Sequence, residues 1–361
     1  MKTILDTVGG SPLVQLTNLV EGREMDIRLK LERTNPGGSI KDRPALYIVK
    51  EAEKRGWLKP GGTIIESSSG NFGISLAMIG AARGYRVIIL VDPKTTPANL
   101  SMLRAYGAEV IVVTEQDDSG SYHKTRIALA NRLHREIRNS FRPDQCFNLL
   151  NGEAHYRQTA AELYEQCEGE LDAVVLTVST GGQIGGFSRF FREAAPHVHI
   201  IAVDAIGSTV FGGVPHAYML PGMGLSWTPA NIDDLGRIDA VFKVPDEDSF
   251  MMCRVLAKHE GILCGGSTGA GMLAAWKLAL QSGTFKKIVC VASDNGERYL
   301  STIYNDEWMR EKSFSLSTSP QEMWKRVEAL EPYSVNPIET ANYKPELGLL
   351  LDSPSLNDLT G

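Results

Sequence analysis

The sequence predicts an α/β protein with mostly parallel sheets. From residue 26 onward, segments with the pattern of a strand alternate with segments with the pattern of a helix, an order typical of βαβ units. The apolar runs at 85–91 and 171–178 indicate buried strands, as in parallel sheets that are covered by helices. Loops of Gly and Ser follow several of the expected strands, and ligands of open α/β sheets bind at such junctions.

The first half of the chain supplies strands and helices in regular alternation. A turn and a short strand are expected within 8–16, and the alternating polarity of 26–32 predicts a strand. An amphipathic helix is expected at 44–54, because Pro44 suits the first turn of a helix. The loop at 139–144 predicts a hinge or domain boundary. The other elements are a strand at 63–66, a helix at 74–83, a strand at 85–91, a helix at 97–106, a strand at 109–114 and a basic helix at 121–138.

The second half repeats this plan. The expected elements are a helix at 154–167, strands at 171–178, 199–204, 240–244 and 288–293, and helices that end near 193, 260, 281 and 309. From about residue 313 the composition shifts to Ser, Pro and Asn, with one short helical patch at 321–330. The tail is therefore expected to lie over the body of the protein or to be partly disordered.

Composition and charge exclude several classes of protein. With 361 residues, 43% hydrophobic and 22% charged, the chain resembles an ordinary globular protein of two domains. A net charge of -6 and a pI near 5.7 leave no general basic surface for nucleic acid. No stretch has the apolar length of a membrane span, and the first residues lack the core of a signal peptide. The five cysteines show no CxxC spacing, so we expect reduced thiols, a cytoplasmic protein and no metal site.

Lys41 is the first candidate for chemistry. It lies in the turn 35–43, between the expected strand at 26–32 and the helix that follows, where Gly37 and Gly38 allow close approach of a ligand. The helix N-terminus and the ammonium group both favour an anionic ligand. A desolvated lysine can also lose its proton near neutral pH and become a Schiff-base nucleophile. Taken alone, a lysine in such a turn also fits a solvated surface position.

The Gly-rich loop 179–186 is suited to a phosphate group. Its glycines let successive N–H groups converge at the start of a helix, whose dipole favours a dianion. It is not a P-loop, because no Gly-Lys-Ser/Thr follows, and a glycine turn made only for packing is the alternative. The residues expected at the phosphate are Ser179, Thr180, Gly181, Gly182 and Gln183.

Two further loops carry hydroxyl and amide side chains. In 67–73, Ser68, Ser69 and Asn71 stand beside backbone N–H groups, which suits a carboxylate. In 265–271, Ser267 begins a helix. Either loop can also be a serine cap on the helix that follows it.

A competing motif lies in the second half. Gly269-Ala-Gly271-Met-Leu-Ala274 has the G-x-G-x-x-A form of a dinucleotide fingerprint, and Asp294 ends a strand about twenty residues further on. On its own it suggests an NAD- or nucleotide-binding protein. It leaves Lys41 and the other loops without a role, and residues 265–268 separate it from the preceding apolar stretch.

Four ordered motifs together resemble a known family. They are Asn35-Pro-Gly-Gly-Ser-Ile-Lys41-Asp-Arg43, Ser68-Ser-Gly-Asn71-Phe-Gly73, Ser179-Thr-Gly-Gly-Gln183 and Gly265-Gly-Ser267-Thr-Gly269. The chain from Val8 to about Met309 resembles the cysteine synthase and cystathionine β-synthase group of fold-type II pyridoxal-phosphate (PLP) enzymes, which share the fold of the tryptophan synthase β-subunit. The resemblance implies two three-layer α/β domains with the cofactor between them, and a homodimer. The implied units are a larger PLP-binding domain at 1–38 and 146–312, a smaller mobile domain at 39–145 and a tail at 313–361.

The resemblance also implies a role for each motif. Lys41 would hold the cofactor as a Schiff base and then act as the general base. Asn71 would bond the ring hydroxyl, the loop 179–183 would hold the phosphate, and Ser267 would meet the pyridine nitrogen. The substrate's α-carboxylate would bind Ser68, Ser69 and Asn71. A neutral serine makes the cofactor a weaker electron sink, which suits β-elimination to an aminoacrylate followed by addition of a nucleophile.

Several stretches resemble one branch of this group, the N-(2-amino-2-carboxyethyl)-L-glutamate synthases. That branch joins O-phospho-L-serine to L-glutamate on the way to 2,3-diaminopropionate, which is used in siderophores. The stretches are 41–45, 91–94, 97–100, 125–127, 178–180, 202–205, 207–208 and 296–300. Arg126 is the candidate for a carboxylate of an acidic substrate, or else a solvated charge on its helix.

Departures from that branch keep other functions open. Trp227 stands where the branch tends to have an arginine, Gln183 where a small hydroxyl residue is usual, and 147–151 lacks a tyrosine. The main alternative is a cysteine synthase that uses O-acetylserine and sulfide. A nucleotide-binding protein and a catalytically silent member of the family are the others, and the intact Lys41 and Ser267 disfavour the last.

Overall fold

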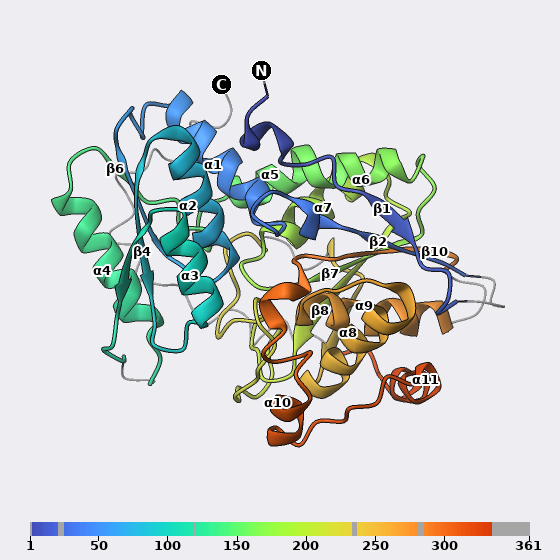
Figure 1. Cartoon of the computed structure of the whole chain (residues 1–361). Helices are drawn as coiled ribbons and strands as arrows, with labels where there is room; N and C mark the ends of the chain where they lie inside the picture. The colour runs from blue at the N-terminus through green and yellow to red at the C-terminus, as the bar shows by residue number, and fades with distance from the viewer. Residues whose placement is uncertain (1, 21–24, 118–119, 233–236, 281–284, 334–361) are drawn as a thin grey trace.

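Two sheets organise the structure, a computed structural model that describes residues 2–20, 25–117, 120–232, 237–280 and 285–333 (Figure 1). The larger sheet has the order β1-β2-β10-β7-β8-β9, and among its described strands only the β1–β2 pair is antiparallel. The smaller sheet has the order β5-β4-β3-β6, with parallel pairing. The strands are β1 Leu13–Gln15, β2 Asp26–Lys30, β3 Thr63–Ser67, β4 Arg86–Val91, β5 Glu109–Val112, β6 Ser140–Phe141, β7 Ala173–Thr177, β8 His199–Ala205, β9 Ala240–Val244 and β10 Lys287–Val291.

Helices lie on both faces of each sheet. In Figure 1, α2 and α3 lie on one side of the smaller sheet and α4 on the other, while α8 and α9 lie across the larger sheet from α5, α6 and α7. The helices are α1 Asp42–Lys54, α2 Asn71–Arg83, α3 Pro97–Ala105, α4 His123–Glu136, α5 Leu150–Ala154, α6 Ala161–Gln166, α7 Gly182–Ala194, α8 Asp246–Glu260, α9 Gly266–Leu280, α10 Asp306–Glu311 and α11 Pro320–Glu328. Single helical turns are η1 Ile4–Thr7, η2 Glu32–Thr34 and η5 Gly296–Tyr299, and the π-helical η3 His155–Ala160 joins α5 to α6. The expected α/β class, with two three-layer units, is confirmed.

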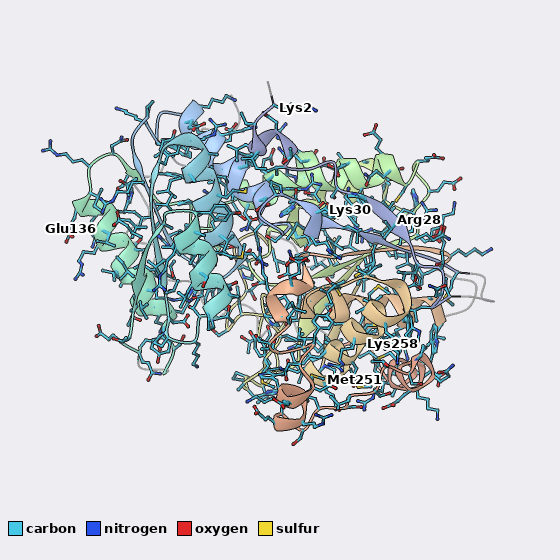
Figure 2. The ribbon with its side chains drawn as sticks, in the orientation of Figure 1. Lys2, Arg28, Lys30, Glu136, Met251 and Lys258 are labelled. Atoms are coloured by element: carbon cyan, nitrogen blue, oxygen red, sulfur yellow. The ribbon has the colours of Figure 1, made fainter. Side chains whose placement is uncertain are left out.

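Alternating side chains of the strands build a separate core on each face of a sheet. In the smaller sheet, Ile64 and Val87 pack toward α1 and α2, while their neighbours Ile65 and Ile88 pack toward α4, as the period of two requires. In the larger unit, Met251 of α8 points into the core whereas Lys258, near the end of the same helix, reaches the surface (Figure 2).

Part of the C-terminal tail packs on the body. Trp324 of α11 stacks on Trp276 of α9, with ring centroids 4.1 Å apart and planes 10° from parallel. Met323 and Val327 of α11 are also fully buried. Such burial contributes about 1.5–3 kcal/mol per large side chain, so this helix is a docked part of the larger unit. The rest of the expected tail, 334–361, lies outside the described residues.

Element boundaries differ from the predictions mainly at the loops. Helix α2 begins at Asn71 and α9 at Gly266, so the two small-residue loops are shorter than expected. The helix expected at 154–167 already begins at Leu150. The helix expected to end near 309 is short, since α10 spans only Asp306–Glu311 and the 3-10 turn η5 precedes it. Gly and Ser weaken a helix only modestly, so tertiary packing decides where these helices start.

The dinucleotide alternative is wrong. Gly269 and Gly271 lie inside α9, and the segment directly before this helix follows α8 and forms no strand, since Cys264 makes only an isolated bridge with Asn295. A Cβ on Gly269 would lie 2.0 Å from the carbonyl oxygen of Ser249, and one on Gly271 would lie 2.6 Å from the sulfur of Cys290. These glycines therefore let α9 pack closely against α8 and β10.

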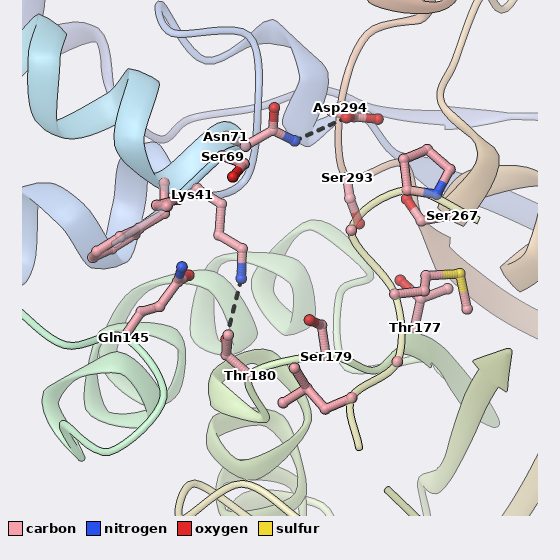
Figure 3. Close-up of a pocket in the computed structure, with 18 of the residues that line it drawn as sticks. Lys41, Ser69, Asn71, Gln145, Thr177, Ser179, Thr180, Ser267, Ser293 and Asp294 are labelled. Atoms are coloured by element: carbon pink, nitrogen blue, oxygen red, sulfur yellow. Dashed lines mark hydrogen bonds between the residues drawn. The ribbon is translucent and has the colours of Figure 1, made fainter. Parts of the chain in front are cut away.

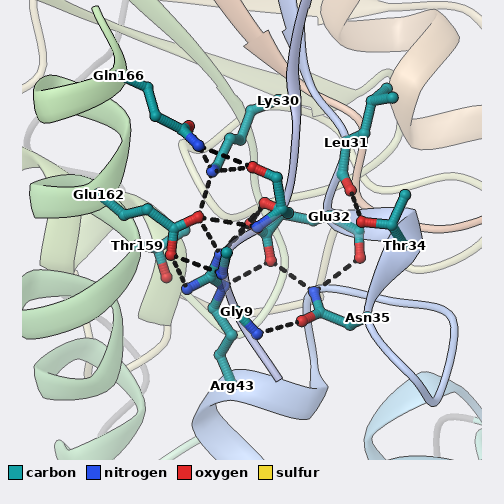
Figure 4. Close-up of polar contacts among 12 residues, drawn as sticks. Gly9, Lys30, Leu31, Glu32, Thr34, Asn35, Arg43, Thr159, Glu162 and Gln166 are labelled. Atoms are coloured by element: carbon teal, nitrogen blue, oxygen red, sulfur yellow. Dashed lines mark hydrogen bonds and ion pairs between the residues drawn. The ribbon is translucent and has the colours of Figure 1, made fainter. Parts of the chain in front are cut away.

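A buried cluster of charges joins β2, η2, α1 and α6 (Figure 4). The guanidinium of Arg43 donates from Nε and Nη2 to the two carboxylate oxygens of Glu32, each at 2.7 Å, and from Nη1 to Glu162 at 2.8 Å. Lys30 donates to Glu162, and at 2.7 Å to the carbonyl oxygen of Ser11. Burial raises the pKa of Glu162, but Arg43 and Lys30 outweigh it and lower that pKa to about 2.

The same cluster anchors the turn that carries Lys41. Asn35 donates at 2.8 Å to Glu32 and accepts at 2.8 Å from the backbone N–H of Gly9. Arg43 follows Lys41 by two residues, so both ends of the turn 35–43 are tied to buried charge. None of the described helices is both long and apolar enough to cross a membrane.

Candidate active site

All of the predicted site residues line one cavity of about 440 Å³ (Figure 3). The cavity lies between the two units, where the carboxyl ends of β3, β7 and β10 meet the starts of α2, α7 and α9, the position expected of ligands in parallel sheets. The predicted residues among its lining are Lys41, Ser68, Ser69, Asn71, Arg126, Ser179, Thr180, Gly181, Gly182, Gln183 and Ser267.

Lys41 reaches into this cavity from the start of α1. Its ammonium group lies 3.3 Å from the hydroxyl of Thr180. Burial disfavours the charged form and lowers the pKa of Lys41 to about 8. Gly38 shapes the turn before it, since its φ is +79° and a Cβ there would lie 2.9 Å from Nη2 of Arg298. Lys41 therefore lies in the cavity with an amine that loses its proton more readily than that of an exposed lysine, which disagrees with the solvated-surface alternative.

We expect uptake of PLP by cofactor-free protein to depend on the protonation of Lys41. Only the neutral amine is a nucleophile, so the uptake rate should rise about tenfold per pH unit below the pKa and level off above it. The plateau should begin near the Lys41 pKa of about 8. Stopped-flow absorbance across this range measures the rate, and a Lys41→Ala sample corrects for surface lysines. A rate that still rises toward the ordinary lysine pKa would contradict the burial argument.

The phosphate loop precedes α7 and is shaped by its glycines. Gly181 has a φ of +79°, and a Cβ on Gly182 would lie 2.0 Å from Oδ1 of Asn151. The first N–H groups of α7 have no partner within the helix, and they point from its N-terminal end, which lines the cavity. The buried Nε2 of Gln183 has no hydrogen-bond partner among the described residues. These donors fit a dianion at the loop.

The loop before α2 contains a serine that caps the helix, as one of the two interpretations of this loop predicted. The hydroxyl of Ser68 accepts from the N–H of Gly73 at 3.0 Å, so this side chain caps the helix. Ser69 instead donates to Asp92 at 2.8 Å. Asn71 donates from Nδ2 to Oδ2 of Asp294 at 2.8 Å. The oxygen and the second N–H of the Asn71 side-chain amide remain for a ligand.

Arg126 of α4 and Ser267 of α9 both line the cavity. Its Nη1 is 3.0 Å from a carboxylate oxygen of Asp92, it donates to Ser69, and its side chain is only 12% exposed. Its Nε is buried and unpaired within the described structure. The solvated-charge alternative is therefore wrong. Ser267, 6% exposed, lies in the first turn of α9.

The sequence prediction missed several polar residues of the cavity. They are Gln145, His123, Asp294, Arg298 and Tyr299. Asp294 follows β10 at its carboxyl end, and this position was the available signal for a ligand-facing side chain. The others come from segments whose fold places them at the cavity only through tertiary packing.

Several residues that line this cavity have buried polar atoms without a hydrogen-bond partner in the described structure. These atoms show whether the cavity suits PLP. Across the described residues, Gln183 Nε2, Gln145 Oε1, Arg126 Nε and Asp294 Oδ1 are buried without a partner and belong to lining residues. Unpaired buried polar atoms are costly, so such a set indicates a polar ligand. An amine, a phosphate cradle and amide and hydroxyl donors around one cavity match the functional groups of PLP.

Comparison with known proteins supports a PLP cofactor. The model of the family described as "Pyridoxal-phosphate dependent enzyme" matches residues 4–294. A protein of Ralstonia nicotianae named N-(2-amino-2-carboxyethyl)-L-glutamate synthase is 42% identical over 310 residues, which cover 85% of this chain and 91% of the relative. A protein of the same name from Cupriavidus metallidurans is 41% identical over 311 residues, with the same coverage of both chains.

Solved structures with the same fold include enzymes of different names. O-ureido-L-serine synthase is 31% identical with a TM-score of 0.78, and covers 86% of this chain and 99% of its own. An O-acetylserine dependent cystathionine β-synthase from Helicobacter pylori is 32% identical with a TM-score of 0.78, and covers 84% and 99%. The predicted fold-type II architecture and PLP cofactor are thereby confirmed. The chain belongs to the family of pyridoxal-phosphate dependent enzymes and is a transferase of the β-replacement type.

Proposed function

We propose that this enzyme joins O-phospho-L-serine to L-glutamate, releasing phosphate and giving N-(2-amino-2-carboxyethyl)-L-glutamate. The observation that carries the proposal is Arg126, a largely buried cation that lines the cofactor cavity. A dicarboxylate nucleophile needs a cation of this kind, because burying a carboxylate without a partner is costly. The names of the two relatives that are more than 40% identical support the same product.

The site residues suit each step of such a reaction. Bound PLP withdraws electrons from the α-carbon of the substrate, so that an α-proton can leave. Lys41, with its pKa near 8, would take that proton at Nζ and return it after the nucleophile has added. Ser69 and Asn71 would hold the substrate's α-carboxylate, residues 179–183 the cofactor's phosphate, and Ser267 its pyridine nitrogen.

Cysteine synthesis from O-acetylserine and sulfide is the second candidate. Trp227 occupies the place where the glutamate-using branch tends to have an arginine, and its ring centroid lies 4.6 Å from that of His123. Burial lowers the pKa of His123 to about 4, so at neutral pH this histidine adds no positive charge. A nucleophile without carboxylates, such as sulfide, would need no positive charge at position 227 or at His123.

Product analysis separates the two candidates. Purified PLP-loaded enzyme is given O-phosphoserine or O-acetylserine, each with glutamate or sulfide, and the products are identified by mass spectrometry. The glutamate adduct from O-phosphoserine supports the proposal. Cysteine from O-acetylserine, with no reaction of O-phosphoserine, would support the second candidate and overturn the first.

We expect Arg126→Met to impair the use of glutamate selectively. Loss of a charge-assisted bond to a carboxylate should raise the KM for glutamate about 10- to 100-fold, while the donor half-reaction changes less. Steady-state kinetics with each substrate varied measures this, and Arg132→Met is the matched control, because Arg132 lies on the same helix and is 63% exposed. Equal losses with glutamate and with sulfide would contradict a role in recognising glutamate.

The remaining expectations concern the setting of the enzyme. We propose a cytoplasmic homodimer in which residues 39–145 form a mobile smaller domain against 1–38 and 146–312. Its product would serve 2,3-diaminopropionate and siderophore synthesis. The parallel pairing of β6 with β3 supports including 140–141 in the smaller unit.

A further inference from the structure

One oxygen of Asp294 accepts two hydrogen bonds inside the cofactor cavity. Oδ2 accepts from Nδ2 of Asn71 at 2.8 Å and from the hydroxyl of Tyr299 at 2.7 Å, and Figure 3 shows the first of these bonds. Asp294 is 3% exposed, and its other oxygen has no partner among the described residues. A buried carboxylate oxygen without a hydrogen-bond partner is costly, so its presence indicates a structural or chemical role.

Asp294 also lies against the turn that carries Lys41. Its neighbours pair with that turn, since the N–H of Ile40 donates to the carbonyl oxygen of Ser293 at 2.7 Å and the N–H of Asn295 donates to that of Gly38 at 3.3 Å. Asn71 begins α2 of the smaller unit, whereas Asp294 follows β10 of the larger sheet. Asp294 therefore joins the two units at the site of the chemistry.

An acceptor at this position fixes how the amide of Asn71 faces the cavity. An ionised carboxylate only accepts hydrogen bonds, so Asn71 must turn its NH₂ group toward Asp294, and the amide cannot flip without losing that bond. Tyr299 keeps its proton and its donor role, because burial and then the charge of Asp294 raise its pKa well above the ordinary value. Burial raises the pKa of Asp294, and the hydrogen bonds from Tyr299 and Asn71 and the positive charge of the buried Arg298 oppose this effect.

We propose that Asp294 is a positioning residue, which holds the Asn71 amide in the one orientation that can bond the cofactor ring. The inference rests on the assignment of Asn71 to the cofactor made above. Loss of the acceptor frees the amide to rotate and should weaken PLP binding about 10- to 100-fold, the range for a lost hydrogen bond to a charged group. The bound cofactor should also show a shifted and broader visible absorbance band.

A double-mutant cycle on PLP affinity tests this positioning role. Cofactor-free wild type, Asp294→Ala, Asn71→Ala and the double variant are titrated with PLP, and the dissociation constant and absorbance maximum are recorded. If Asp294 acts through Asn71, its replacement should change the affinity less than about threefold in the Asn71→Ala background. Asp294→Asn, which keeps an acceptor oxygen of the same reach, should restore affinity and spectrum to near the wild type.

Each other outcome overturns a defined statement. Independent, multiplicative losses in the cycle, or an Asp294→Asn variant as weak as Asp294→Ala, would show that Asp294 acts by charge or by folding and not by positioning Asn71. An effect of Asn71→Ala without any effect of Asp294→Ala overturns this inference alone. No effect of Asn71→Ala overturns the assignment of Asn71 as well. Thermal unfolding of the cofactor-free variants checks the fold, and Asp294→Ser replaces Asp294→Ala if the latter does not fold.

Discussion

Replacement of Lys41 by alanine is expected to remove essentially all activity. The variant should lose the visible absorbance band of the bound cofactor and at least about a thousandfold in kcat, because one side chain supplies both the attachment point and the general base. Absorbance spectra of reconstituted protein and product formation from O-phosphoserine measure the two effects. The fold should persist, since Thr180 is the only side-chain hydrogen-bond partner of the Lys41 amine among the described residues.

Lys50→Ala provides the matched control for Lys41. Lys50 lies on the same helix, α1, but is exposed, so its loss should leave band and activity unchanged. A Lys41→Ala protein that keeps the visible band and turns over at the wild-type rate would overturn the assignment of the catalytic lysine.

Replacement of Glu32 by glutamine is expected to destabilise the protein strongly. Glu32 is fully buried and binds both arms of the Arg43 guanidinium, which is itself 2% exposed. Without the charge of Glu32, the buried guanidinium keeps only Glu162 as a carboxylate partner among the described residues, and breaking a buried ion pair costs about 3–5 kcal/mol. Urea unfolding of the cofactor-free protein measures the change in the free energy of unfolding.

An exposed ion pair of similar geometry is the control for this prediction. Arg86 donates to Glu109 from Nε and Nη2 at 2.7 and 2.8 Å, but the two side chains are 49% and 53% exposed. Glu109→Gln should therefore change stability by no more than about 1 kcal/mol. Similar losses for both variants would mean that burial is not what makes the Glu32–Arg43 pair important.

The sequence by itself determined the class of fold and most of the site. The order of strands and helices predicted parallel sheets, and the motifs around Lys41, Asn71, Gly181 and Ser267 predicted one ligand site, because carboxyl ends of parallel strands meet at one edge. Such predictions succeed because turns and buried strands depend on residues that are near one another in the chain.

Only the tertiary structure decided how neighbouring side chains use these motifs. In the folded protein Ser68 caps helix α2, Arg126 forms an ion pair with Asp92, and Asp294 accepts a hydrogen bond from Asn71. The glycines that resemble a dinucleotide fingerprint lie on the face of α9 that packs against α8 and β10. Hydrogen bonds and burial join residues that are far apart in sequence, so their partners, and the pKa shifts that follow, exist only once the two units have packed together.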